Sequence, residues 1–146
     1  MNRPSLFLLL AIALLPISCS KKVSTTSNVT PEALSGEWQI VSIEGDTLPI
    51  VAEEEIPSIQ FDIEENSFSC YVGCNRMGGS LSISKDSIKL GNIFSTRMLC
   101  PDKMQLEQKC GVALDKVSLA SMTNDDKIIL QDKNGTALIT LERISK

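Results

Sequence analysis

The 146-residue sequence contains no histidine, and this absence excludes several classes of function. Ser-His-Asp and Cys-His nucleophilic sites, histidine-ligated zinc and a histidine-based pH switch all need that side chain. Positive charge is also scarce, because 14 basic side chains stand against 18 acidic ones, for a net charge of −4. Nucleic acids and anionic membrane surfaces attract basic proteins, so neither is expected to be the main partner.

The sequence also lacks a hydrophobic run long enough to span a bilayer. The apolar stretch at residues 6–15 has about ten residues, whereas a transmembrane helix needs about 20. With Arg3 before it, this stretch is typical of a signal peptide. It leads to Leu15-Pro16-Ile17-Ser18-Cys19, which resembles the lipobox of bacterial lipoproteins, in which the cysteine is acylated and the chain is cut just before it.

We therefore expect residues 1–18 to be a lipoprotein signal peptide and Cys19 to be the lipidated residue that anchors the protein in a membrane. The alternative is a secretory signal that the general peptidase cuts nearby, for instance after Ser20. Residues 19–35 are polar and rich in Ser and Thr, which predicts a flexible tether. Ser20 stands where an Asp favours inner-membrane retention, so we expect the outer membrane, facing the periplasm or the surface.

Residues 36–146 contain no linker, repeat or low-complexity segment and predict one domain. Alternating apolar and polar residues, separated by turn-forming residues, predict short strands. These strands are expected over residues 38–43, 59–64, 68–72, 81–83, 88–90, 118–122, 127–131 and 137–144.

One segment has helical periodicity instead. Pro101 and Asp102 suit the first turn of a helix. Apolar residues then recur at helical spacing, at Leu106, Cys110, Ala113, Leu114 and Val117. Consecutive hairpins with one late helix predict a mainly β, α+β fold, in which an antiparallel sheet carries the helix. We expect the sheet to curl strongly or to form a partly open barrel.

The cysteines support a further prediction. Beyond Cys19 the chain has Cys70, Cys74, Cys100 and Cys110, and an even number after a signal peptide indicates two disulfides. Cys70 on a strand and Cys110 on the helix are both expected to face the core, which favours the pairs Cys70–Cys110 and Cys74–Cys100. The pairing of Cys100 with Cys110 is disfavoured, because ten helical residues rise about 15 Å and a bridge needs Cα atoms within about 7 Å.

Two other uses of these cysteines fit less well. A Cys₄ zinc site would have the spacings C-x3-C and C-x9-C, whereas zinc ribbons favour C-x2-C. A catalytic redox pair usually forms a C-x-x-C motif, and this sequence has none. We therefore expect no metal and no cofactor.

Two short motifs resemble those of the META domain family. Gly73-Cys74-Asn75-Arg76-Met77-Gly78-Gly79 is similar to the GCN-x-x-x-G signature, and Ser95-Thr96-Arg97-Met98-Leu99-Cys100 to the T-x-M-x-C segment. Glu107 stands where the family helix usually carries a Glu. The likeness extends from Gly36-x-Trp38 to about Arg143. The family that it resembles includes the heat-shock-associated HslJ-type envelope lipoproteins.

The resemblance implies a secreted or lipid-anchored single domain without an assigned molecular function, in which the cysteines corresponding to Cys74 and Cys100 form a disulfide. The motif residues also have a physical interpretation. Gly73, Gly78 and Gly79 suit positive φ angles, and Asn75 can hydrogen-bond neighbouring backbone. Thr96 and Arg97 are expected to join the second motif loop to the first. These residues either hold two loops around a disulfide or form a binding site. The candidate binding residues are Gly73, Asn75, Arg76, Gly78, Thr96, Arg97, Met98 and Glu107.

Three functions remain open. The first and favoured one is a non-enzymatic envelope lipoprotein that binds another protein, a peptide or a cell-wall component. The second is a small periplasmic enzyme, but Ser82-Ile83-Ser84-Lys85 matches S-x-x-K on an expected strand, and no S-D-N or K-T-G partner is present. The third is a stress-related factor that holds unfolded envelope proteins, which would need an exposed apolar groove.

Overall fold

The computed structural model describes residues 27–49, 52, 56–85 and 87–144. The predicted signal peptide and Cys19 lie outside these residues. The elements in chain order are β1 (Ser27–Asn28), α1 (Pro31–Leu34), β2 (Gly36–Ile43), β3 (Asp46–Thr47), β4 (Ser58–Asp62), β5 (Ser67–Tyr71), β6 (Arg76–Ser84), β7 (Ser87–Ser95), α2 (Met104–Lys116), β8 (Leu119–Met122), β9 (Ile128–Gln131) and β10 (Ala137–Arg143).

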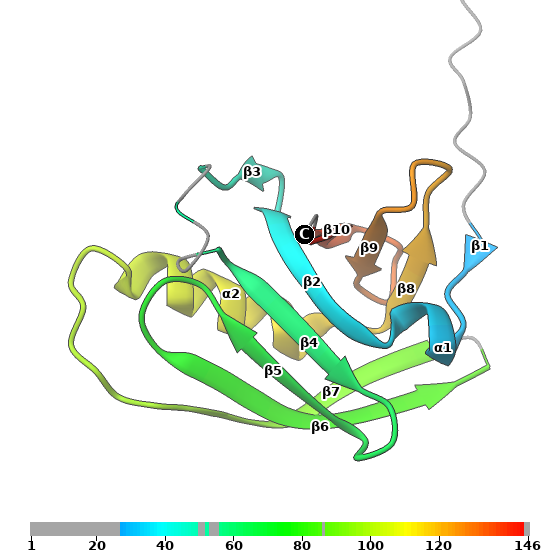
Figure 1. The fold of residues 1–146 in the computed structure, drawn as a ribbon, viewed down its shortest axis with the longest axis horizontal. Coiled ribbons are helices and arrows are strands. Elements are labelled where there is room, and N and C mark those ends of the chain that lie inside the picture. The colour runs from blue at the N-terminus through cyan, green and yellow to red at the C-terminus, as the bar shows by residue number, and fades with distance from the viewer. Residues whose placement is uncertain (1–26, 50–51, 53–55, 86, 145–146) are drawn as a thin grey trace, which may run out of the picture.

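The strands form one antiparallel sheet in the order β1-β8-β9-β10-β2-β4-β5-β6-β7, with β3 paired to β2. The sheet curls into an open half-barrel and α2 packs across it (Figure 1). This arrangement confirms the predicted mainly β fold with one main helix. No helix among the described residues has the length and apolar composition needed to cross a bilayer.

The core lies between the curled sheet and α2. The strands bury alternate residues, such as Ile59 and Phe61 in β4 and Phe68 and Cys70 in β5. On α2 the predicted stripe buries its central residues completely, as Cys110, Ala113 and Leu114 are 0% exposed. Leu106 is partly buried, and Val117 caps the end of the helix.

The helix begins later than predicted. Pro101 lies in a turn in which the N–H groups of Lys103 and Met104 both donate to the Cys100 carbonyl, at 2.9 and 3.2 Å. α2 itself begins at Met104. The disulfide at Cys100 and this turn hold the chain in a loop before it enters the helix, so the proline precedes the first helical turn.

Part of the predicted tether is folded. α1 begins after Thr30, whose hydroxyl accepts a hydrogen bond from the Ala33 N–H at 3.3 Å, and it buries Leu34. The Trp38 indole N–H donates to the Leu34 carbonyl at 2.8 Å. Arg143 stacks on the Trp38 ring at 3.8 Å and donates to the carbonyls of α1 and its cap. The ordered domain therefore includes residues 27–35, which the sequence placed in the tether.

Strands β6 and β7 are also longer than predicted and carry a bulge. The register shifts between Gly78 and Ser80, where Asn92 and Ile93 of β7 face one residue of β6. Asn92 adopts a positive φ of 50°, as bulge residues often do. β7 lies at the end of the sheet order, and its N-terminal half meets β8 through a hydrogen bond from the Ile88 N–H to the Ser118 carbonyl at 3.0 Å.

Candidate functional site

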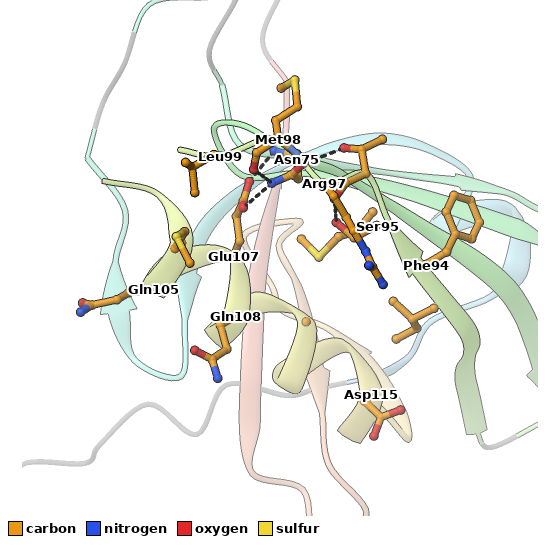
Figure 2. Close-up of a pocket in the computed structure, with 15 residues that line it drawn as sticks. Asn75, Phe94, Ser95, Arg97, Met98, Leu99, Gln105, Glu107, Gln108 and Asp115 are labelled. Carbon is orange, nitrogen blue, oxygen red and sulfur yellow. Dashed lines mark hydrogen bonds between the residues drawn. The ribbon is translucent and has the colours of Figure 1, made fainter. Parts of the chain in front are cut away.

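Asn75 is the centre of a network that joins the two motif loops to α2 (Figure 2). Its side-chain nitrogen donates to the Met98 carbonyl at 3.1 Å and to Glu107 Oε2 at 2.8 Å. Its Oδ1 accepts from the Met98 N–H at 2.7 Å and from the Thr96 hydroxyl at 2.9 Å. Asn75 is 6% exposed, and this set uses every donor and acceptor of its side chain. Asn75 therefore acts in this structure as a buried connector of loops.

Glu107 completes the network from the helix. It lies in the first turn of α2, where a carboxylate is favoured by the helix dipole. In addition to the side-chain bond, the other carboxylate oxygen accepts the backbone N–H of Asn75. Both oxygens of Glu107 are thus used in holding the first motif loop.

The two motif loops also bond to each other directly. The Thr96 N–H donates to the Arg76 carbonyl at 3.0 Å, and the Arg76 N–H donates to the Thr96 hydroxyl at 3.1 Å. The prediction that Thr96 joins the loops is confirmed. The same prediction for Arg97 is wrong, because its side chain makes no hydrogen bond or ion pair with the described residues and lines a groove instead.

The motif glycines serve two different purposes. Gly73 has a φ of 124°, as expected for a tight loop. Gly78 and Gly79 do not adopt positive φ angles but lie within β6, which corrects the prediction. A Cβ on Gly79 would lie 2.4 Å from the Gly91 carbonyl oxygen, and one on Gly78 would lie 2.9 Å from the Phe94 ring. These two residues are small because β7 and Phe94 approach them closely.

Cys74 and Cys100 form the predicted disulfide, with Cα atoms 6.4 Å apart. The bond lies beside the Asn75 network and fixes the end of the 96–100 loop. Both the covalent link and the network therefore hold this loop in place before α2.

Cys70 and Cys110 correct the second predicted bridge. Their sulfurs face each other across β5 and α2 at 3.7 Å, so their proximity is confirmed, but they are two free thiols. This separation is far above the 2.0 Å of a disulfide bond, and both residues are closed off in the core. The hydrogen bond to Cys110 and burial raise the pKa of the Cys70 thiol well above its usual range. The protonated thiol is therefore the favoured form.

Next to the network lies an open groove of about 820 Å³ between the end of β7 and α2. Its floor includes Met77, Ile93 and Gly111. Its rim carries large apolar side chains with high exposed fractions, namely Phe94 at 66%, Met98 at 58%, Leu99 at 83% and Met104 at 52%. We call this surface the Phe94 groove. Figure 2 shows Arg97 reaching from the loop toward the space between the loop and α2, and Asp115 near the far end of the helix.

The Phe94 groove contains residues that the sequence did not single out. Phe94, Met104 and Asp115 lie outside the motifs, and an exposed apolar side chain cannot be told from a core residue by its type alone. The only sequence feature that points to this surface is the order of residues 92–99, in which apolar and polar residues do not alternate as they do in a half-buried strand. No three side chains from His, Cys, Asp and Glu gather as a metal site would require within the part of the chain that the structure describes.

Comparisons with known proteins agree with this fold. The model of the META domain matches residues 31–144. An NMR structure of a protein is similar with a TM-score of 0.60 and 23% identity, covering 78% of this chain and 94% of that one. An NMR structure of a protein from Burkholderia xenovorans has a TM-score of 0.62 at 18% identity, covering 90% and 100%. A DUF4847 family protein from Bacteroides vulgatus has a TM-score of 0.51 at 12% identity, covering 77% and 95%.

These identities show the fold alone, and a search of curated proteins gave no match. The family match covers most of the sequence and includes both loops of the Asn75 network, the disulfide and α2. The chain therefore belongs to the META domain family.

Proposed function

We propose that this chain is an envelope lipoprotein, anchored through Cys19, whose META domain binds a segment of another protein and catalyses no reaction. The anchor is supported by the sequence before Cys19, and Ser20 favours the outer membrane. Binding is supported by one observation above all, the gathering of Phe94, Met98, Leu99 and Met104 around one groove.

The exposure of these side chains is the physical reason for expecting a partner. Exposed apolar patches on soluble proteins usually mark interaction sites. The loop that presents Met98 and Leu99 is fixed by the disulfide and by the Asn75 network. A surface that is held rigid before binding loses little conformational entropy when a partner docks.

The polar groups at the groove favour binding over catalysis. Both Glu107 oxygens are engaged by Asn75, so this carboxylate serves the loop. Two other charged groups of the lining, Arg97 and Asp115, form no ion pair with any residue that the structure describes, and they lie on the loop and on α2, on opposite walls of the groove. A few polar groups in an apolar groove suit orientation of a ligand.

The groove also favours a second candidate, a factor that holds unfolded envelope proteins. Such a factor needs the exposed apolar surface that the Phe94 groove offers. The two functions differ in selectivity, because a holding factor would suppress aggregation of unrelated unfolded proteins, whereas a specific receptor would bind one partner.

Site-specific photo-cross-linking in intact cells tests the proposal. A photoreactive residue replacing Leu99 should give a discrete adduct, while one replacing Val112, which is 46% exposed on α2 outside the groove, should give none. Equal adduct patterns from the two positions would contradict a binding role for the groove. Many diffuse adducts from position 99 would favour the holding factor.

A further inference from the structure

The outer edge of β7 changes character along its length. β6 pairs with one side of the strand, and β7 ends the sheet order. On the other side the Ile88 N–H donates to the Ser118 carbonyl, which closes the sheet against β8 at that point. The chain between β7 and β8 forms α2. β7 and α2 move apart toward Ser95, and the Phe94 groove lies between them (Figures 1 and 2).

The register shows which backbone groups face this opening. The Thr96 N–H donates to the Arg76 carbonyl, so it points toward β6. Successive residues of an extended strand point their N–H and C=O groups to opposite sides. The backbone groups of Ile93 and Ser95 therefore point away from β6, and no backbone hydrogen bond joins them to any other described residue on that side.

The groove beside this edge has the length of a short extended peptide. Along α2 its lining runs from Met104 to Asp115, and eleven helical residues rise about 16 Å. An extended chain advances about 3.3 Å per residue, so about five residues fit. Ile93 is partly buried against the core, whereas Phe94 on the other face is exposed, so apolar contacts flank the edge on both sides.

The charges at the groove give the ligand a direction. Arg97 stands at the open end and Asp115 at the end nearer the β7–β8 seam, and neither has an ion-pair partner within the described ranges. A strand antiparallel to β7 would start near Arg97 and end toward Asp115. An acidic residue followed by a basic residue about four positions later would complement both charges.

We propose that the Ile93–Ser95 edge of β7 binds an extended peptide segment as an added antiparallel strand, with an acidic side chain at Arg97, apolar side chains along the groove and a basic side chain at Asp115. This proposal rests on the binding function of the Phe94 groove and specifies the ligand of that site. Strand addition supplies backbone hydrogen bonds as the common attraction, and the groove supplies side-chain selectivity. A second copy of this acidic chain is a less complementary occupant, since both copies carry a net charge of −4.

Selection from a random linear heptapeptide library tests this. The target is the chain from residue 19 onward with Cys19→Ala, so that it carries no lipid. The decisive variant is Ser95→Pro, which removes an outward N–H that donates to no other described backbone group, and its matched control is Ser95→Ala, which keeps that N–H. Equal unfolding midpoints for the two variants establish that both fold.

Selected peptides should alternate apolar residues between an acidic and a basic one. They should bind the parent and Ser95→Ala alike and Ser95→Pro at least tenfold more weakly, and they should slow hydrogen exchange of the Ile93 and Ser95 amides. A second test, which needs no protein variant, uses N-methylated peptides. Methyl groups on the alternate amides that face β7 should abolish binding, and those on the amides that face away should not.

Binding that survives Ser95→Pro and leaves exchange at Ile93 unchanged, but is lost in Met104→Glu, would overturn strand addition and leave the groove as the binding site. Absence of enriched peptides would overturn the peptide ligand and count against the proposed function as well. A concentration-dependent dimer that Ser95→Pro abolishes would assign the edge to a second copy and overturn the proposal.

Discussion

The Glu107 carboxylate accepts hydrogen bonds from both the backbone and the side-chain amide of Asn75. This pair joins the first turn of α2 to the first motif loop, and through Asn75 to the second loop. The motif residues therefore include a set that maintains the loops, with Asn75 buried at its centre, and a second set, Arg97 and Met98, whose exposed side chains line the Phe94 groove.

Asn75→Ala should destabilise the domain strongly. It would remove the four part-buried hydrogen bonds of the Asn75 side chain, and each such bond contributes about 0.5–1.5 kcal/mol. We expect a loss on the order of 3 kcal/mol in the free energy of unfolding, measured in urea. Arg97→Ala is the matched control on the neighbouring loop and should change stability by less than about 0.5 kcal/mol. Equal effects of the two variants would contradict the division of the motif.

Two glycine substitutions should act in opposite directions. Gly79→Ala should lower the free energy of unfolding by about 2–3 kcal/mol, because its Cβ would meet the Gly91 carbonyl oxygen at 2.4 Å. Gly111→Ala should raise it by about 0.5–1 kcal/mol, since its nearest neighbour would be the Met77 sulfur at 3.8 Å and Ala favours the helix. Thermal unfolding of both variants measures this difference, and a destabilising Gly111→Ala would show that the helix packs more tightly than described.

The disulfide should stabilise the fold through the unfolded chain. Cys74 and Cys100 are 26 residues apart, and closing a loop of that length contributes about 3.5 kcal/mol in the chain-entropy estimate. Cys74→Ser combined with Cys100→Ser should lower the free energy of unfolding by roughly that amount. Peptide mapping without reduction should recover these two cysteines joined, and their recovery as free thiols would contradict the assignment.

Cys70 and Cys110 should remain thiols that react only upon unfolding. Alkylation of the native protein should be slow, and alkylation in denaturant should label both. Because the folded pKa of Cys70 is raised, the stabilising contribution of its protonated form is present below the unfolded thiol pKa of about 8.5 and declines as pH rises above it. The free energy of unfolding should therefore fall between pH 7 and alkaline pH. For Cys70→Ala the fall over the same pH range should be smaller than for the wild type. A pH-independent difference between the two proteins would contradict this.

Cys19 should carry the lipid. Metabolic labelling with palmitate should mark the wild-type protein and be lost in Cys19→Ala, and globomycin should block processing. Cys110→Ala, which alters a core thiol, serves as the control and should keep its label. Labelling that persists without Cys19 would contradict this assignment, and a wild-type protein that takes up no label would favour a plain secretory signal.

Local patterns predicted much of this fold because several strands bury every second residue. Ile59 with Phe61 and Phe68 with Cys70 alternate in the sequence as they do in the sheet. The helix stripe was predictable from its apolar spacing, whereas the Cys74–Cys100 pair followed from assigning Cys70 to Cys110 and from the resemblance to the META domain family. The bridge predicted between Cys70 and Cys110 was wrong, because two core-facing thiols can lie within hydrogen-bond distance without forming a disulfide.

Other features depend on distant contacts. The four residues of α1 carry a local start signal, because Thr30 caps the helix and Pro31 follows it, but a helix this short also depends on Arg143, which is 110 positions from Ala33 in the chain. Gly78 and Gly79 do not favour strands by themselves and belong to β6 because β7 approaches them closely. The exposure of Leu99 could not be predicted either, because it results from where the disulfide places the loop.

The most direct test of the account is the adduct yield of a photoreactive residue replacing Met98 in intact cells, with and without Leu99→Glu. Leu99 is 83% exposed, so its replacement should leave the free energy of unfolding within about 0.5 kcal/mol. The account predicts a discrete protein adduct that falls at least tenfold in Leu99→Glu while the domain stays folded. An adduct of undiminished yield in the folded variant would contradict the claim that the Phe94 groove is the binding surface.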